Sequence, residues 1–137
     1  MAAVAGGIAE MVGKALMKHT PELIVENGGD VFVNSRISKR IGVFGDTSPF
    51  NGKLALQIEP DKMPLGVCTS SGTIDPSLSF GKADADAAAT VLGNMVKRPE
   101  DMSSVLEWGM KIPGIQGIMV IIDDRLGIAG DPKIVKQ

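Results

Sequence analysis

The sequence predicts one α+β domain of 137 residues. Apolar residues recur with helical periodicity at the start of the chain and again after residue 83. Between these two stretches lie short runs of β-branched and aliphatic residues that are typical of strands. Neither an internal repeat nor a linker interrupts this order, and the chain is long enough to bury one core. A composition of 44% hydrophobic and 22% charged residues indicates a folded chain rather than a disordered one.

The composition also excludes several classes of protein. Fourteen basic and sixteen acidic residues give a net charge of −2, which argues against a non-specific nucleic-acid binder. No apolar run approaches the roughly 20 residues of a transmembrane helix. With one cysteine, Cys68, and one histidine, His19, the chain excludes a disulfide framework and a Cys-rich or multi-His metal centre. A lone cysteine fits a reducing, cytoplasmic compartment.

The first elements are a helix and a hairpin. Residues 2–18 predict a helix, and Pro21 ends it. Its small residues let another backbone or a ligand come close; they are Ala5, Gly6, Gly7 and Ala9. Strands are predicted at residues 23–25 and 31–33. The Asn-Gly pair between them is the strongest short hairpin signal.

The remaining elements follow in a regular order. Strands are predicted at residues 41–44 and 54–59, the second because large apolar residues alternate with small or polar ones. Residues 66–82 are rich in Gly, Ser, Thr and Pro and predict a loop, which is where functional residues often lie. The last predicted elements are helices at 83–97 and 101–111, a buried strand at 117–122 and a short strand around 126–129.

The first candidate site is the turn Asn27-Gly28-Gly29-Asp30. Paired glycines after a strand allow a ligand's phosphates or ring to approach the backbone, and successive N–H groups can cradle an anion. The same four residues also suit a plain hairpin turn. The motif alone leaves both interpretations open.

The second candidate is Cys68-Thr69-Ser70-Ser71-Gly72. Hydroxyls beside a glycine offer hydrogen-bond donors to phosphate or sugar oxygens, whereas a solvated turn is the structural alternative. As a nucleophile, Cys68 has no histidine near it in the sequence to activate it. A free cysteine is more often a small buried hydrophobic residue.

The third candidate is the pair Asp86 and Thr90. Residues four apart on a helix project from the same face, so a carboxylate and a hydroxyl would lie together. Such hard oxygen ligands suit Mg²⁺, which keeps other positions for waters and substrate phosphates. The alternative is an aspartate that stabilises a helix N-terminus, a role that Asp84 would also fill, with Thr90 bonded to its own helix.

Taken in order, the small-residue helix, the Asn-Gly-Gly-Asp turn, the Thr-Ser-Ser-Gly loop and the Asp-x-x-x-Thr helix resemble the ApbE flavin-transferase superfamily. The similarity extends over nearly the whole chain and is greatest to a small branch found in archaea and some anaerobic bacteria. It implies an α+β fold, with a mixed or antiparallel sheet packed against helices, that binds FAD with Mg²⁺. Characterised members transfer FMN to a protein threonine or cleave FAD to FMN and AMP.

The resemblance also implies roles for individual residues. Those matching the family's magnesium ligands are Asp86, Thr90 and, through its backbone carbonyl, Ala9. Those matching the glycine pair near the flavin and the loop that contacts it are Gly28, Gly29, Asp30, Ser70, Ser71 and Gly72. The implied partners are a flavin nucleotide and an acceptor protein.

Three departures from the family pattern leave the activity open. The family's His-x-x-Asp-Pro segment is reduced here to Asp75-Pro76, with Gly72 in place of the histidine. The strand that members carry before the Asp-x-x-x-Thr helix is expected to be missing, because Gly81 leads almost directly into residues 83–86. Members also begin well before the first helix, so we expect the sequence to lack the amino-terminal part of the family fold.

Three functional hypotheses therefore stand. The first is a Mg²⁺-dependent enzyme that moves FMN or cleaves the FAD pyrophosphate. The second is a non-catalytic module that binds a flavin, another anionic ligand or a partner protein. The third, implied by the archaeal relatives alone, is a role in anaerobic sulfur assimilation, including homocysteine formation, with Cys68 relaying sulfur. A homodimer is a further expectation, because it would cover the exposed faces of a thin core.

Overall fold

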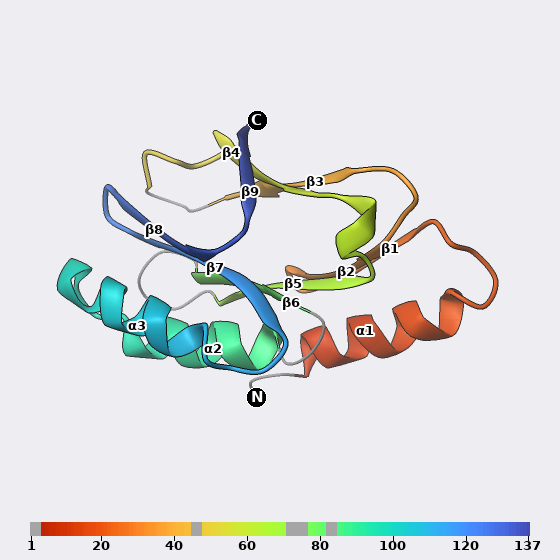
Figure 1. Cartoon of the computed structure of the whole chain (residues 1–137), viewed down its shortest axis with the longest axis horizontal. Coiled ribbons are helices and arrows are strands. Elements are labelled where there is room, and N and C mark those ends of the chain that lie inside the picture. Colours follow the sequence, from red (N-terminus) through yellow and green to blue (C-terminus); the bar gives the residue numbers. More distant parts are fainter. Residues whose placement is uncertain (1–3, 45–47, 71–76, 82–84) are drawn as a thin grey trace.

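The protein is built in three layers, seen in a computed structural model that describes residues 4–44, 48–70, 77–81 and 85–137. Helices form the first layer, a six-stranded sheet the second and a three-stranded sheet the third (Figure 1). The larger sheet is therefore covered on both faces. This arrangement confirms the predicted α+β class.

The larger sheet is antiparallel throughout, with the strand order β1-β2-β5-β6-β7-β8. Its strands are β1 (Leu23–Asn27), β2 (Asp30–Asn34), β5 (Leu65–Ser70), β6 (Ser77–Gly81), β7 (Ile115–Ile122) and β8 (Arg125–Gly130). The smaller sheet has the order β3-β4-β9, and its central strand pairs antiparallel with both neighbours. Its strands are β3 (Lys39–Val43), β4 (Leu54–Ile58) and β9 (Lys133–Lys136).

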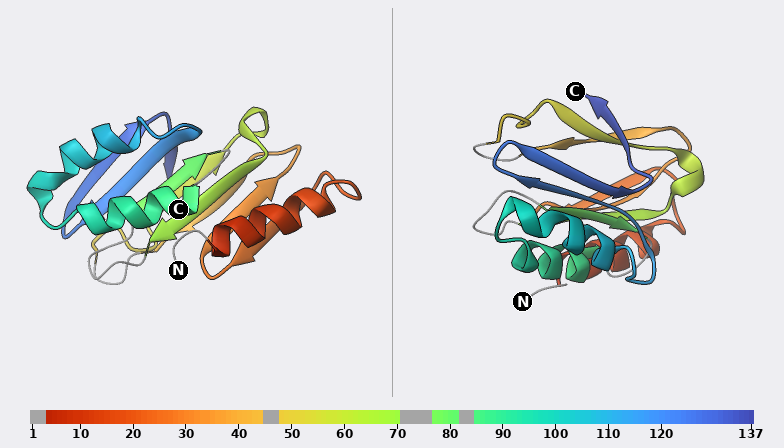
Figure 2. Two further views of the ribbon diagram at one scale, coloured as in Figure 1. Left: turned by 90° about the horizontal axis from the view of Figure 1, so that it is seen from below. Right: turned by 60° about the vertical axis from the view of Figure 1, so that its left-hand side comes forward.

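The helices lie side by side on one face of the larger sheet (Figure 2). They are α1 (Ala5–Leu16), α2 (Ala85–Met95) and α3 (Met102–Gly109), and two short 3-10 turns accompany them, η1 (Pro60–Lys62) and η2 (Pro99–Asp101). α1 packs on β1 and β2, α2 on β5 and β6, and α3 on β7 and β8. None of the described helices is both long and apolar enough to cross a membrane.

The prediction of a loop over residues 66–82 is wrong for the part of it that the structure describes. β5 and β6 occupy those positions, and β6 fills the place of the strand expected to be missing before α2. The Ser, Thr and Gly residues join the sheet because β5 pairs with β2 on one side and β6 on the other, with Val67 and Cys68 buried. Strand β9 was not predicted at all. It is only four residues long and begins directly after Pro132.

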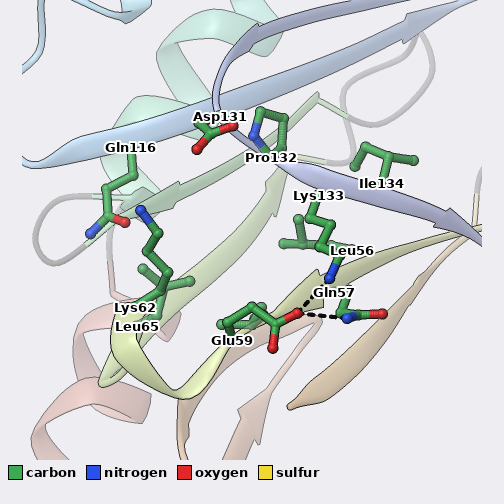
Figure 3. A pocket seen from close by; sticks show the side chains of 11 residues that line it. Leu56, Gln57, Glu59, Lys62, Leu65, Gln116, Asp131, Pro132, Lys133 and Ile134 are labelled. Carbon is green, nitrogen blue, oxygen red and sulfur yellow. Dashed lines mark hydrogen bonds and ion pairs between the residues drawn. The ribbon is translucent and has the colours of Figure 1, made fainter.

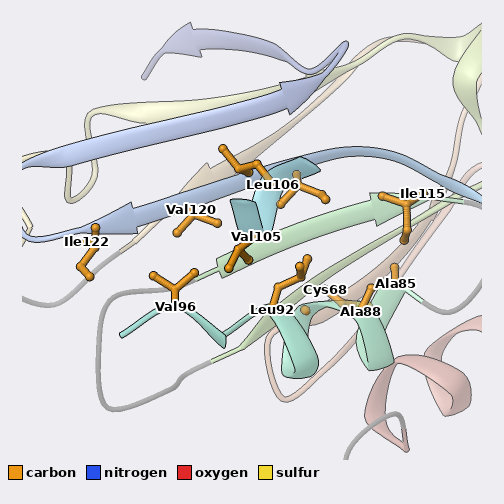
Figure 4. Close-up of a cluster of buried hydrophobic side chains, with 12 residues drawn as sticks. Cys68, Ala85, Ala88, Leu92, Val96, Val105, Leu106, Ile115, Val120 and Ile122 are labelled. Atoms are coloured by element: carbon orange, nitrogen blue, oxygen red, sulfur yellow. The ribbon is translucent and has the colours of Figure 1, made fainter. Parts of the chain in front are cut away.

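Strand β7 is buried on both faces and divides the apolar core in two. Ile118 and Val120 pack with Leu92 in the cluster between the sheet and the helices α2 and α3 (Figure 4). Met119 and Ile121 lie in the cluster between the two sheets. Successive side chains of a strand point to opposite faces, so two-sided burial explains the unbroken apolar run at residues 118–122.

Helix α1 contacts the sheet through its smallest residues. Its two buried residues are Ala9 and Gly13, and a Cβ atom built on Gly13 would lie 2.1 Å from Cδ1 of Phe32 in β2. The larger apolar residues of the helix lie on its outer face, where Ile8, Met11 and Leu16 are 42–64% exposed. The packing of α1 therefore depends on close approach to Phe32 rather than on large side chains.

This packing predicts opposite effects for two glycine-to-alanine substitutions in the same helix. Gly13→Ala is expected to lower the free energy of unfolding by about 1–3 kcal/mol, because its methyl group collides with the Phe32 ring. Gly7→Ala has no heavy atom within 4 Å of the new Cβ and is expected to raise it by about 0.5–1 kcal/mol through helix propensity. Urea unfolding of both variants measures the difference. Equal effects of the two substitutions would contradict the packing.

Candidate functional site

Three segments singled out in the sequence meet at one end of the larger sheet. Asp30 at the start of β2 lies beside the end of β5, and its Oδ1 accepts a hydrogen bond from Thr69 N at 3.0 Å. The first turn of α1 joins the first turn of α2, because Gly6 N donates to Asp86 Oδ2 at 2.9 Å across 80 residues of sequence. Asn27 Nδ2 donates to the Ala5 carbonyl at 3.2 Å and ties α1 to the β1–β2 turn.

The Gly28-Gly29 turn is a hairpin, as predicted, and it also leaves backbone accessible. Both residues have left-handed backbone conformations, with φ of +64° and +97°, which favour glycine. Gly29 N donates to Glu26 Oε1 at 2.7 Å, whereas the Gly28 N–H has no acceptor among the residues that the structure describes. No heavy atom lies within 4 Å of a Cβ built on Gly28. A ligand can therefore reach this backbone.

Gly6 allows the close contact between α1 and α2. A Cβ atom at this position would lie 2.7 Å from Asp86 Cβ and 2.9 Å from Cys68 Sγ. The expected close approach at the small residues of this helix is therefore confirmed for Gly6. Asp86 occupies the first turn of α2 and bonds the first turn of α1, so the positive ends of two helix dipoles stabilise its carboxylate.

Asp30 is a buried carboxylate, 4% exposed, next to Asp86. Burial raises the pKa of Asp30, and the Thr69 N–H that donates to it lowers the pKa by less than burial raises it. The neighbouring Asp86 carboxylate raises the pKa of Asp30 further. Two carboxylates held this close favour a shared proton or a bound cation.

Cys68 is part of the core at the floor of this site, 3% exposed and packed with Ala85, Ala88 and Leu92 (Figure 4). Burial raises the pKa of the Cys68 thiol above its usual range, and the nearby Asp30 and Asp86 carboxylates raise it further. Because the thiolate is the nucleophilic form, this environment does not favour the sulfur-relay hypothesis.

The other predicted site residues are placed as follows. Thr90 lies one turn beyond Asp86, half-buried, and its hydroxyl forms no hydrogen bond with another described residue. Ala9 is buried one turn beyond Gly6, and its carbonyl belongs to the hydrogen-bond ladder of α1. Ser70 ends β5 and is half-buried. Predictions at Ser71, Gly72, Asp75-Pro76 and Asp84 lie outside the described residues.

The candidate metal ligands are therefore carboxylate, hydroxyl and backbone oxygens. Over the described ranges, no group of three or more His, Cys, Asp or Glu side chains is arranged to hold a metal ion. Sequence reasoning did not connect Gly6 with Asp86 or Thr69 with Asp30. The only signal for the first contact was the cluster of small residues at the start of α1.

The chain is similar to a group of archaeal proteins and matches one family model over most of its length. The model, described as AbpE bacteria, matches residues 1–127. Identities are 37% over 153 residues to a UPF0280 protein of Methanocaldococcus jannaschii, 38% over 149 residues to one of Methanocella arvoryzae and 41% over 153 residues to one of Methanopyrus kandleri. These alignments cover 98–99% of this chain and 60–62% of the relatives. The chain thus spans about three fifths of their length.

The two neighbouring carboxylates predict a pH-dependent effect of Asp30→Asn. An aspartate whose pKa is raised by folding stabilises the fold below the ordinary aspartate pKa and loses that contribution as pH rises through the raised value. Asparagine keeps the acceptor for Thr69 N and carries no charge. The Tm of Asp30→Asn minus that of the wild type should therefore increase from about pH 3.5 to pH 7. Thermal unfolding in a chelating buffer measures this Tm difference. A difference that stays constant or falls with pH would contradict the placement of a buried Asp30 beside Asp86.

Proposed function

The chain belongs to the AbpE bacteria family, and from this premise we propose that the end of the sheet around Asp86 binds a flavin nucleotide together with Mg²⁺. The resemblance of the same segments to the ApbE superfamily supplies the ligand class. The observation that carries the proposal is the convergence of the Gly28-Gly29 turn, the end of β5 and the first turns of α1 and α2. Segments distant in the sequence thus meet around one carboxylate pair.

The residues present fit Mg²⁺ in their chemistry. Asp86 and Thr90 would hold the ion through hard oxygen atoms on one face of α2, and the backbone carbonyl of Ala9 is the third ligand that the family pattern implies. Asp30 places a second carboxylate beside Asp86, and a cation would relieve the repulsion between the two. When bound, Mg²⁺ neutralises the charge that develops on a pyrophosphate as a P–O bond breaks.

The surrounding backbone favours an anionic ligand at the same place. The N-terminal ends of α1 and α2 direct their partial positive charge toward this end of the sheet. The turn adds the Gly28 N–H, and β5 ends there at Ser70 with its hydroxyl. A diphosphate close to these donors, with a flat ring near the open side of Gly28, accounts for the site's features.

The proposed reaction is cleavage of the FAD pyrophosphate or transfer of FMN, with Asp86 holding the metal. The competing hypothesis is binding without turnover. The catalytic activity, the acceptor protein and the homodimer are all proposed, whether the protein turns FAD over or only binds it. The assay below separates the two hypotheses because products are measured apart from binding.

Asp86→Asn is expected to weaken Mg²⁺-dependent FAD binding at least about tenfold and to abolish any release of FMN. The amide oxygen of asparagine still accepts the Gly6 N–H, so the α1–α2 junction is kept while the charge is lost. FAD titration with and without Mg²⁺, followed by chromatography for FMN and AMP, measures both steps. Asp124→Asn, in the exposed turn between β7 and β8, is the matched control and should behave as wild type.

The outcomes separate cleanly. FMN release by the wild type establishes the enzyme, and saturable Mg²⁺-dependent binding without products establishes the binding module. If FAD fails to bind at millimolar concentration, or if Asp86→Asn binds it as tightly as Asp124→Asn does, the proposed function is wrong.

A further inference from the structure

A cavity of about 450 Å³ opens near the start of β5 (Figure 3). It lies between β4, the 3-10 turn η1, the start of β5 and residues 131–134. Leu65 belongs to the core between the two sheets, whereas Cys68 at the floor of the candidate flavin site belongs to the cluster under the helices, so the cavity and the candidate flavin site lie on opposite faces of the larger sheet. The volume is in the range of small-molecule binding sites.

The cavity has an apolar floor. Leu56, Ile58 and Leu65 line it and belong to the core between the two sheets, each at most 3% exposed. Ile134 of β9 adds a fourth aliphatic side chain. An aliphatic group seated here would remain in contact with the core and out of water.

One ion pair at the rim is already satisfied within the protein. Glu59 accepts hydrogen bonds from Lys133 Nζ at 2.7 Å and from Gln57 Nε2 at 2.6 Å (Figure 3). It also accepts one from the Ser38 hydroxyl. These donors, Lys133 first, lower the pKa of Glu59 to about 2. The pair ties β9 to the end of β4 and has little capacity left for a ligand.

Three other polar groups at the rim have no such partner. Lys62 and Asp131 form no ion pair, and the Gln116 amide forms no side-chain hydrogen bond, with any residue in the described part of the chain. The Lys62 side chain extends toward Gln116, and Asp131 lies on the same side of the cavity (Figure 3). Asp131 N donates to the Gln116 backbone carbonyl at 3.4 Å, which holds the backbones of these two residues next to each other.

We propose that this cavity binds an α-amino acid with an aliphatic side chain. Its carboxylate pairs with Lys62 and the Gln116 amide, its ammonium group pairs with Asp131, and its side chain covers the floor at Leu56 and Leu65. One cation and one anion at the same rim select a zwitterion. The Asp131 carboxylate repels a ligand that carries only a negative charge, and the Lys62 ammonium repels a ligand that carries only a positive charge.

Calorimetric titration with L-leucine tests the proposal, with three comparison ligands that each lack one group. 4-Methylpentanoate lacks the ammonium group, 3-methylbutylamine lacks the carboxylate, and glycine lacks the side chain. Leucine is expected to bind saturably in the millimolar range or tighter, and each comparison ligand at least about tenfold more weakly. No saturable binding of leucine, or equal binding of all four, would overturn the proposal.

Variants locate the binding. Lys62→Gln and Asp131→Asn remove exposed charges, so both are expected to fold, and each should weaken leucine binding about tenfold. Lys97→Gln, an exposed lysine just after α2, is the matched control and should bind like the wild type. Leucine binding that is unchanged in both Lys62→Gln and Asp131→Asn would place the ligand elsewhere. Asp86→Asn should leave leucine binding intact, so this proposal and the flavin proposal fail separately.

Discussion

The burial of the larger sheet on both faces is the constraint on which the other features depend. Helices cover one face and the smaller sheet covers the other, so β7 sends alternate side chains into two separate cores. Apolar side chains fill most of both faces of the strands. Polar groups and accessible backbone therefore gather where the strands end. Both candidate sites follow this rule, one at the Ser70 end of β5 and the other at the Leu65 end.

The carboxylates at the two candidate sites have opposite environments. At one end, Asp30 is buried beside Asp86, and burial and the like charge make its ionised form unfavourable. At the other, Glu59 is fully supplied with donors by Lys133, Gln57 and Ser38. A site of the first kind is short of positive charge and suits a cation. At the second, the charges of Glu59 and Lys133 cancel each other, so the side chains left to recognise a ligand are those of Lys62, Gln116 and Asp131.

The helices, the Asn27–Asp30 hairpin and the buried strand β7 could be predicted from the sequence, because periodicity and turn residues mark them, whereas the short strand β9 carries no such mark. The prediction failed at β5 and β6, where Ser, Thr and Gly mask strands whose stability comes from pairing with β2 and β7. Of the candidate site, the turn, Ser70 and Asp86 were each singled out in the sequence as candidates. Their meeting depends on Gly6 reaching Asp86, a contact between residues at opposite parts of the chain that no local pattern contains.

The shallow attachment of α1 has a consequence for ligand affinity. Only Ala9 and Gly13 of this helix are buried, whereas its first turn supplies one wall of the candidate flavin site. Segments with few buried side chains detach at a lower free-energy cost than the whole domain unfolds. A ligand that binds only when α1 is docked on the sheet then has a weaker apparent affinity. Its apparent Kd is the intrinsic Kd divided by the fraction of molecules in which the helix is docked. Phe32 packs against Gly13 rather than against the first turn of α1, so a residue away from the candidate site would influence how tightly a ligand is held.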